Sequence, residues 1–200
     1  GERSQQRIII AGDRIVSVRS MDSTAPPVAT TVDGKNRYVI PGLWDMHVHF
    51  VYEPDLQEPM ADLFLRYGVT SVRDTGGNFA QLTQHRESLR ARQQPTPRVF
   101  LSGPLLDGKR VVYDGSNPAR PALGTSIPDA AAAAQIVSAL VGGGADFIKI
   151  YEMVHPDVFA ALGAAAQRAD VPIAAHVPLS LPADTAGPHV GSLEHLRNIE

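Results

Sequence analysis

The residue types best suited to metal chemistry gather in residues 41–49, which read PGLWDMHVH. If this segment is a strand, its side chains alternate between two faces, so that Asp45, His47 and His49 share one face. Two imidazoles one pleat apart can chelate a divalent ion, and a buried face of this kind needs a partner to offset lost hydration. The alternative is a polar strand whose histidines are satisfied by hydrogen bonds.

Three further candidate ligands lie near the ends of other expected strands. Lys149 stands in FIKIYE, His176 ends the apolar run PIAAH, and His195 follows an acid in SLEH. Each has a structural alternative, because a strand-end lysine can reach water and a core histidine can be hydrogen-bonded. Ligands of parallel α/β proteins bind at the carboxyl ends of the strands, so the pattern as a whole favours one shared site.

The elements that would position these side chains alternate between strand and helix after residue 40. Apolar periodicity and turn residues predict strands at 43–50, 69–72, 98–101, 147–151, 172–177 and 192–196. Helices are predicted at 60–67, 79–92, 130–142 and 156–168, the third opened by a capping box from Ser126 to Asp129. Residues 105–125 read as a long Gly/Pro-rich loop. Before residue 41 the chain reads as all-β, with strands at 7–10, 15–18 and 38–40.

Repeated strand–helix units predict an α/β fold with a parallel sheet and helices outside it. A closed (β/α)₈ barrel needs eight strands and typically about 250 residues. Residues 41–200 supply six expected strands, whereas an open doubly wound sheet would need no more. The periodicity therefore leaves both architectures open.

Composition excludes several functions. The 200 residues carry a net charge of −3 without a basic stretch, so neither a nucleic acid nor an anionic membrane is expected as partner. No cysteine is present, which excludes a disulfide, a thiol nucleophile and a thiolate metal site. The least polar stretch, 130–144, is too short to span a bilayer. Absent G-x-S-x-G and phosphate-loop motifs disfavour a serine hydrolase and a nucleotide-binding protein. The chain begins at Gly1 without a signal peptide, so a cytoplasmic location and, after signal removal, a periplasmic or secreted one stay open.

The chain resembles the amidohydrolase superfamily of binuclear metal-dependent hydrolases, in its imidazolonepropionase-like and prolidase-like branch. Residues 41–49 match the first-strand motif, and residues 144–149 match the strand of the carboxylated lysine. His176 and residues 192–195 match the next two ligand strands. The resemblance implies a (β/α)₈ TIM-type barrel, incomplete here, with its first six units at 41–200 and a small β-domain at 1–40.

The resemblance also implies a role for each ligand. His47 and His49 would hold the first metal, Lys149 as a carbamate would bridge both ions, and His176 and His195 would hold the second. Nitrogen and oxygen ligands without thiolate suit zinc, with Mn²⁺, Co²⁺ or Fe²⁺ as alternatives. The implied reaction is hydrolysis of an amide or peptide bond in a small molecule or dipeptide by a metal-bridging hydroxide.

One departure from the family concerns its general base, an Asp at the end of the eighth strand. No residue after His195 matches that Asp. The resemblance therefore implies the N-terminal portion of a longer enzyme, partnered by its own remainder or a second chain, and inactive as 200 residues alone. The alternatives are a cyclic-amide, imidazolone or ester hydrolase on the same site, a mononuclear variant, or a non-catalytic half-barrel. A homo-oligomer stays possible.

Further residues near the expected strand ends are weaker candidates. Tyr151, on the Lys149 face, is either a carbonyl-polarising group or a packed side chain. Arg73 and Asp74 precede Gly76-Gly77, where a loop could approach substrate, and Asp45 could orient a histidine ligand. The remaining candidates are the cations of the 105–125 loop, which bind a carboxylate or are solvated, and three histidines expected on the surface: Lys109, Arg110, Arg120, His85, His155 and His189.

Overall fold

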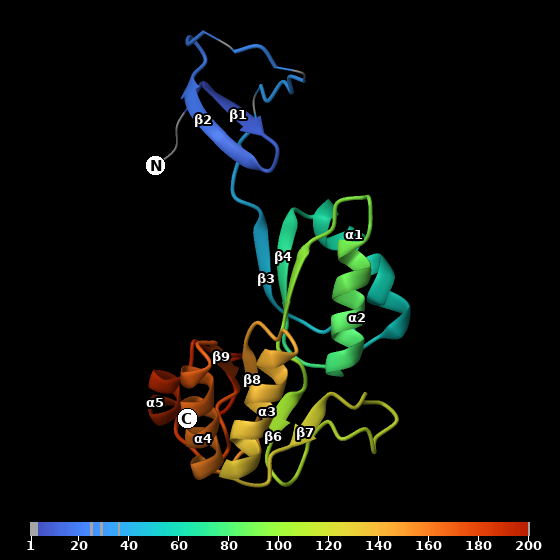
Figure 1. Ribbon diagram of the computed structural model, residues 1–200, viewed down its shortest axis with the longest axis vertical. Helices are drawn as coiled ribbons and strands as arrows, with labels where there is room; N and C mark the ends of the chain where they lie inside the picture. The colour runs from blue at the N-terminus through green and yellow to red at the C-terminus, as the bar shows by residue number, and fades with distance from the viewer. Residues whose placement is uncertain (1–3, 25, 29, 36, 200) are drawn as a thin grey trace. The chain divides into compact units, whose positions relative to one another are not determined.

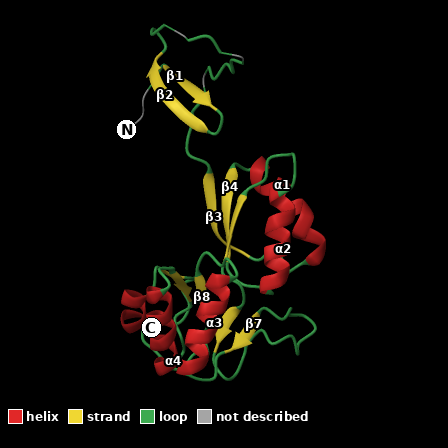
Figure 2. Ribbon diagram, viewed as in Figure 1, coloured by secondary structure: helices red, strands yellow, loops and turns green. Residues whose placement is uncertain are grey.

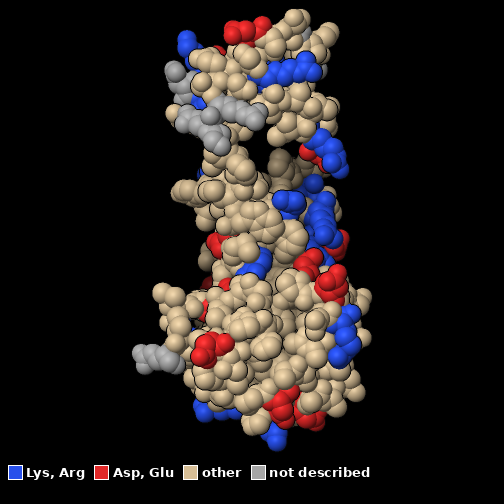
Figure 3. Space-filling view, turned by 90° about the vertical axis from the view of Figure 1, so that its left-hand side faces the viewer, with Lys and Arg blue, Asp and Glu red and all other residues tan. Residues whose placement is uncertain are grey.

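The computed structural model describes residues 4–24, 26–28, 30–35 and 37–199. The chain divides into two compact units, Gly1–Ile40 and Pro41–Glu200, and each is described by itself. Among the described residues, no helix has the length and apolar character that a membrane span requires. On the face that Figure 3 shows, acidic and basic side chains are scattered among a larger uncharged area.

The described part of the first unit contains an antiparallel hairpin, formed by β1 (Gln6–Ala11) and β2 (Arg14–Ser20). Gly12 has a φ of 61° and supplies the left-handed conformation of the turn between them. The strand expected at residues 38–40 is wrong, because these residues have no regular structure and their side chains are exposed. A run with strand propensity forms a strand only where a neighbouring strand accepts its hydrogen bonds.

The second unit is built on two parallel sheets (Figure 1). The smaller has the order β3-β4-β5, with bounds Leu43–Val48, Val69–Asp74 and Arg98–Leu101. The larger has the order β10-β9-β8-β6-β7, with bounds Ser192–Leu193, Ile173–Ala175, Ile148–Ile150, Leu105–Asp107 and Gly124–Ser126. The expected α/β class with parallel strands is confirmed, and the five-stranded sheet is consistent with part of a TIM-type barrel.

Helices pack against these sheets (Figure 2). Between helices and sheets lie two main apolar clusters. The helices are α1 (Gln57–Arg66), α2 (Phe79–Arg90), α3 (Ala130–Gly142), α4 (Pro156–Arg168) and the short α5 (Ala183–Ala186). Two short 3₁₀ turns span Pro54–Leu56 and Gly187–His189. The first cluster joins β3–β5 to α1 and α2, through residues such as Val72 and Leu82. The second joins β6, β8 and β9 to α3 and α4, through residues such as Leu106 and Leu162. Phe79 contacts both clusters.

The segment 105–125 was expected as a loop, yet it begins with β6 and ends in β7. Gly103, with a φ of 85°, and Pro104 separate β5 from β6, so β5 pairs with β4 while β6 pairs with β8. Gly and Pro residues before and within this segment indicate a loop in the sequence. The three residues between β5 and β6 therefore concealed the start of a strand.

Two smaller expectations are also wrong. Ser126 is the last residue of β7, and the N-cap of α3 is Asp129, whose carboxylate accepts a hydrogen bond from Ala132 N at 2.9 Å. His85 was expected on the surface but is 3% exposed, because α2 turns it onto Phe50, with ring centroids 4.8 Å apart. His155 and His189 are exposed.

Candidate active site

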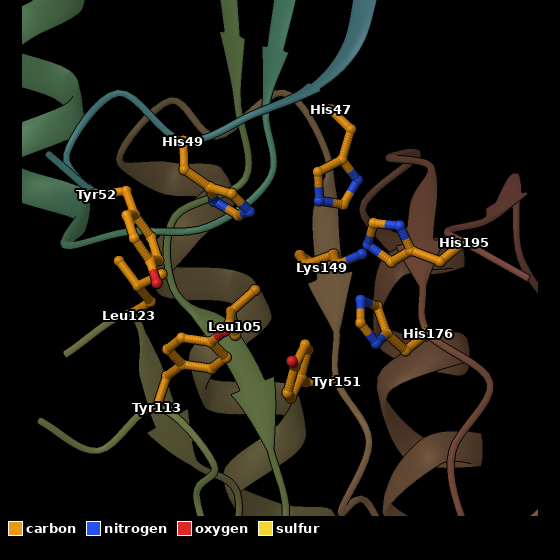
Figure 4. A pocket seen from close by; sticks show the side chains of 10 residues that line it. All are labelled: His47, His49, Tyr52, Leu105, Tyr113, Leu123, Lys149, Tyr151, His176 and His195. Atoms are coloured by element: carbon orange, nitrogen blue, oxygen red, sulfur yellow. The ribbon is translucent and has the colours of Figure 1, made fainter. Parts of the chain in front are cut away.

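All five predicted metal ligands line one cavity of about 230 Å³ in the second unit. Figure 4 shows His47, His49, His176 and His195 around the side chain of Lys149. The remaining wall is aromatic and aliphatic, and consists of Tyr52, Leu105, Tyr113, Leu123 and Tyr151. The cavity therefore combines a nitrogen-rich side with an apolar side.

Each ligand candidate lies in or just after a strand of the two parallel sheets. His47 is in β3 and His49 follows it by one residue, whereas Lys149 is in the middle of β8. His176 directly follows β9, and His195 lies two residues beyond β10. The ring centroid of His47 is 5.2 Å from that of His49 and 4.5 Å from that of His195. The parallel strands thus bring residues that are up to 148 positions apart in the sequence, His47 and His195, to one cavity.

The Nδ1 atoms of three histidines are occupied by acceptors of the protein. His47 Nδ1 is 2.6 Å from Glu194 Oε2, His49 Nδ1 is 2.9 Å from the Gly76 carbonyl, and His176 Nδ1 is 3.1 Å from Glu152 Oε1. A carbonyl oxygen can only accept, so His49 donates from Nδ1 and its Nε2 carries the free lone pair. Hydrogen bonds of this kind fix the tautomer and orientation of metal-binding histidines.

Burial favours the neutral form of three imidazoles of the cavity, those of His49, His176 and His195. Desolvation lowers the pKa of His49 to about 4, helped by the neighbouring His47, and lowers the pKa of His176 to about 3, helped by Lys149. The pKa of His195 is lowered in the same direction by burial and by His47, although this side chain is exposed at the cavity rim. At neutral pH these three rings therefore present unprotonated nitrogen.

Lys149 is the most unusual group of the cavity. Its side chain is fully buried, and Nζ is one of the few buried polar atoms of the described residues without a hydrogen-bond partner. Burial lowers its pKa from 10.5 to about 7; the charge of Glu194 opposes this shift and that of Arg73 adds to it. A neutral amine is a nucleophile, whereas an ammonium is not.

These donors fit a divalent metal ion when Lys149 is counted among them. Within the described ranges, no three His, Asp or Glu side chains are arranged to hold an ion by themselves. The unpartnered Lys149 Nζ lies among four imidazoles. Carboxylation of this amine would supply two oxygen ligands at that position. Nitrogen and oxygen donors of this kind suit zinc and other first-row divalent ions.

The residues predicted to bind substrate occupy different environments. Tyr151 lines the cavity, with its ring centroid 4.3 Å from that of His176, and burial raises its pKa. Arg73 and Asp74 are absent from the cavity wall. Arg73 binds Glu194 instead, and the fully buried Asp74 accepts hydrogen bonds from two backbone amides, Phe50 N and Gly76 N.

Other polar candidates also found different partners. The Asp45 carboxylate accepts a hydrogen bond from the backbone N of His47 at 3.1 Å and has no contact with an imidazole ring among the hydrogen bonds of the described residues. Lys109 and Arg110 are exposed, and the Arg120 guanidinium lies 5.6 Å from the ring centroid of Tyr113.

Sequence reasoning missed Glu194 and Glu152 as partners of the histidines, and Tyr52 and Tyr113 as parts of the wall. Glu194 and Glu152 are 8% and 4% exposed, which is rare for glutamate unless it is paired. The available signal was position: Glu194 precedes His195, and Glu152 follows Lys149 and Tyr151 at the end of an apolar run. Tyr52 and Tyr113 lie in loops, where no periodic signal exists.

We expect the metal-free protein to lose stability as the pH falls from about 6.5 toward 4, because the pKa values of His49 and His176 are lowered to about 4 and 3. In that range these two histidines bind more protons in the unfolded chain than in the folded one, so their contribution makes unfolding easier as the pH falls. The buried Asp74, whose pKa is raised to about 7, opposes part of this effect. A pKa that is one unit lower in the folded chain corresponds to about 1.4 kcal/mol. Urea unfolding across this range measures the slope.

Matched histidine variants identify the source of that slope. His176→Asn should flatten the dependence, whereas His155→Asn, at an exposed histidine, should leave it unchanged. An identical slope in His176→Asn and the wild type would show that His176 is not the group responsible.

Comparison with known proteins gives matches at the level of structure. No protein-family model and no curated protein matches the sequence. A prolidase solved with N-methylphosphonate-L-proline is 24% identical, with a TM-score of 0.77 over 98% of this chain and 57% of that chain. A solved amidohydrolase is 26% identical, with a TM-score of 0.75 over 96% of this chain and 56% of the other. Bottromycin amidohydrolase is 29% identical, with a TM-score of 0.71 over 96% of this chain and 38% of the other.

The solved structures that share this fold include proteins described as amidohydrolases, a prolidase and a Xaa-Pro dipeptidase. The two amidohydrolases, at 26% and 29% identity, support a similarity to the amidohydrolases, and the prolidase, at 24%, shares the fold. The chain spans little more than half the length of the prolidase and amidohydrolase structures that it matches.

Proposed function

We propose that the protein is a metal-dependent amidohydrolase that cleaves an amide or peptide bond in a small, dipeptide-sized substrate. The observation that carries this proposal is Lys149, a buried amine without a partner among four imidazoles. A buried amine of this kind costs folding free energy, which a chemical role at the site would explain. The prolidase with a bound proline phosphonate supports the substrate class.

We further propose that the two parallel sheets contribute the first six strands of a (β/α)₈ barrel. In this arrangement β5 and β6 are two halves of one interrupted strand, and β7 is an added edge strand. Residues 1–40 would belong to a small β-domain and residues 41–200 to the hydrolase barrel. The neighbours of the same fold support this architecture.

Five residues would hold the metal ions. His47 and His49 would bind one ion, and His176 and His195 the other. The neutral Lys149 amine would add to the carbon of CO₂ and release one proton, and the carbamate would bridge the pair. Divalent ions, of which zinc is the one expected, would activate water and polarise the scissile carbonyl.

The protein's own side chains would bind and orient the substrate. Because burial raises its pKa, the Tyr151 hydroxyl keeps its proton and can donate a hydrogen bond to a substrate carbonyl. Leu105, Leu123 and Tyr52 form the wall that would exclude water and accept an apolar part of the substrate. No described cation other than Lys149 lines the cavity, which favours an uncharged group at this wall.

The proposal predicts about two divalent ions per chain and one carbamate. Metal content after dialysis against zinc, and the carbon NMR signal of protein equilibrated with ¹³C-bicarbonate, measure both. Lys109→Met, at an exposed lysine, should leave the carbamate signal unchanged. Hydrolysis is then assayed with Xaa-Pro dipeptides, a cyclic amide, an imidazolone and an ester. A protein with neither metal nor carbamate in the presence of both reagents would contradict the proposal.

A further inference from the structure

The carboxylate of Glu194 connects three strands at the edge of the cavity. Its Oε2 is 2.6 Å from His47 Nδ1, on β3. Its Oε1 accepts a hydrogen bond from Arg73, on β4, at 2.6 Å and another from Ser192 Oγ, on β10, at 2.7 Å. Because Glu194 is 8% exposed, these partners rather than water satisfy its oxygens.

The backbone at the end of β10 explains how Glu194 reaches this position. Adjacent residues of a strand point to opposite faces, so Glu194 and His195 should diverge. Instead both contact His47, since His195 has a φ of 66°, which breaks the alternation. The amide of Glu194 is held by the Ala175 carbonyl at 2.7 Å. A left-handed histidine is strained and persists only where its surroundings enforce it, and such strain clusters at functional sites.

Arg73 holds the carboxylate from the opposite side. Its Nε donates to the Met46 carbonyl at 2.9 Å, and its guanidinium lies 5.0 Å from the ring centroid of Phe147. The guanidinium is therefore fixed by the residue that precedes His47 while it binds the glutamate that contacts the His47 ring. A hydrogen-bonded charge pair of this geometry is both strong and directional.

We propose that Glu194 is a positioning residue that holds the His47 ring with its proton on Nδ1 and its Nε2 lone pair free for a metal ion. The inference rests on the proposed function, because it assumes that His47 is a metal ligand. Glu194 itself does not line the cavity. An ionised carboxylate accepts but cannot donate, so it selects this tautomer, as carboxylates do behind metal-binding histidines elsewhere.

The tautomer of His47 can be measured without a metal. Nitrogen–proton correlation NMR of the protein, freed of metal with a chelator and kept at mildly alkaline pH, should show His47 protonated on Nδ1 in the wild type. In Glu194→Ala the ring should change to a mixture of tautomers. Glu194→Gln retains one acceptor oxygen and should partly rescue the Nδ1 form. Glu87→Gln, at an exposed glutamate of α2, is the matched control and should have no effect.

Titration with Co²⁺, followed by its visible spectrum, is the second measurement. Loss of a hydrogen-bonding partner of this kind typically weakens metal affinity by about 10–100-fold. We expect that loss in Glu194→Ala, a smaller one in Glu194→Gln and none in Glu87→Gln. The double variant Arg73→Met/Glu194→Met removes both charges together, and replaces Glu194→Ala if that variant does not fold.

The outcomes separate the two proposals. An unchanged His47 tautomer and unchanged Co²⁺ affinity in a folded Glu194→Ala protein would overturn the positioning role while leaving the metal site intact. A wild type that binds no Co²⁺ would overturn the proposed function, and with it the metal-binding part of this inference. The NMR result would still show whether Glu194 selects the tautomer.

Discussion

A Lys149→Met variant is expected to be more stable than the metal-free wild type and to have no hydrolase activity. Methionine fills nearly the same volume with apolar atoms, whereas Lys149 Nζ is fully buried and has no hydrogen-bond partner. Removal of an unsatisfied buried polar group relieves about 1–3 kcal/mol. Activity would fall to background, because no carbamate can form. Urea unfolding in the presence of chelator measures the stability. The activity is measured as kcat/KM with an Xaa-Pro dipeptide, in the presence of the C-terminal remainder that the resemblance implies.

Lys109→Met is the control for the change of residue type, because Lys109 is exposed. It should alter neither stability nor activity. A Lys149→Met protein less stable than the wild type would mean that the amine makes favourable contacts in the folded state. Retained hydrolysis would exclude the lysine from the metal site.

The second large effect is expected at Asp74. Its Oδ2 accepts a hydrogen bond from Phe50 N at 2.7 Å, and its Oδ1 accepts one from Gly76 N at 3.1 Å. The Gly76 carbonyl in turn accepts from His49 Nδ1 at 2.9 Å. Asp74→Ala would leave two buried amides unpaired, each costing about 1–3 kcal/mol. We expect a stability loss of about 2–5 kcal/mol, together with weaker metal binding through a displaced His49.

Asp74→Asn is the conservative counterpart. Its single amide oxygen can accept one of the two hydrogen bonds, so it should lose less stability than Asp74→Ala. Asp62→Ala, at an exposed aspartate of α1, is the matched surface control and should change stability little. Urea unfolding and Zn²⁺ calorimetry measure both properties. If Asp74→Ala kept wild-type stability, the two backbone hydrogen bonds could not be important for the fold.

The sequence predicted most of the fold because the parallel strands and long helices leave strong periodic signals. The strand at 98–101 and the helix at 156–168 each have the predicted bounds. The missed strands β6 and β7 lie among Gly and Pro residues, which indicate a loop, whereas the equally short β8 and β9 lie within longer apolar runs. The wrong strand at 38–40 shows the opposite case, in which local propensity exists but no neighbouring strand pairs with it.

The candidate ligands could be proposed from the sequence because each one lies in or close to the end of a predicted strand. Strand geometry then brings them together without further information. Their partners could not be found in this way. Glu194 reaches His47 only because His195 adopts a left-handed backbone, and Asp74 is turned toward amides on both sides of His49. Such contacts depend on local backbone conformations that the alternation of apolar and polar residues does not encode.

The two apolar clusters give the proposed site a mechanical consequence. His47 and His49 lie in and just after β3, which packs into the first apolar cluster. Lys149 and His176 lie in β8 and just after β9, which pack into the second. Ions held by all four residues would act as a reversible cross-link between the two sheets. A ligand that binds only the folded state stabilises it. Metal binding would therefore reduce local opening between the two sheets and make the unfolding of the second unit more cooperative.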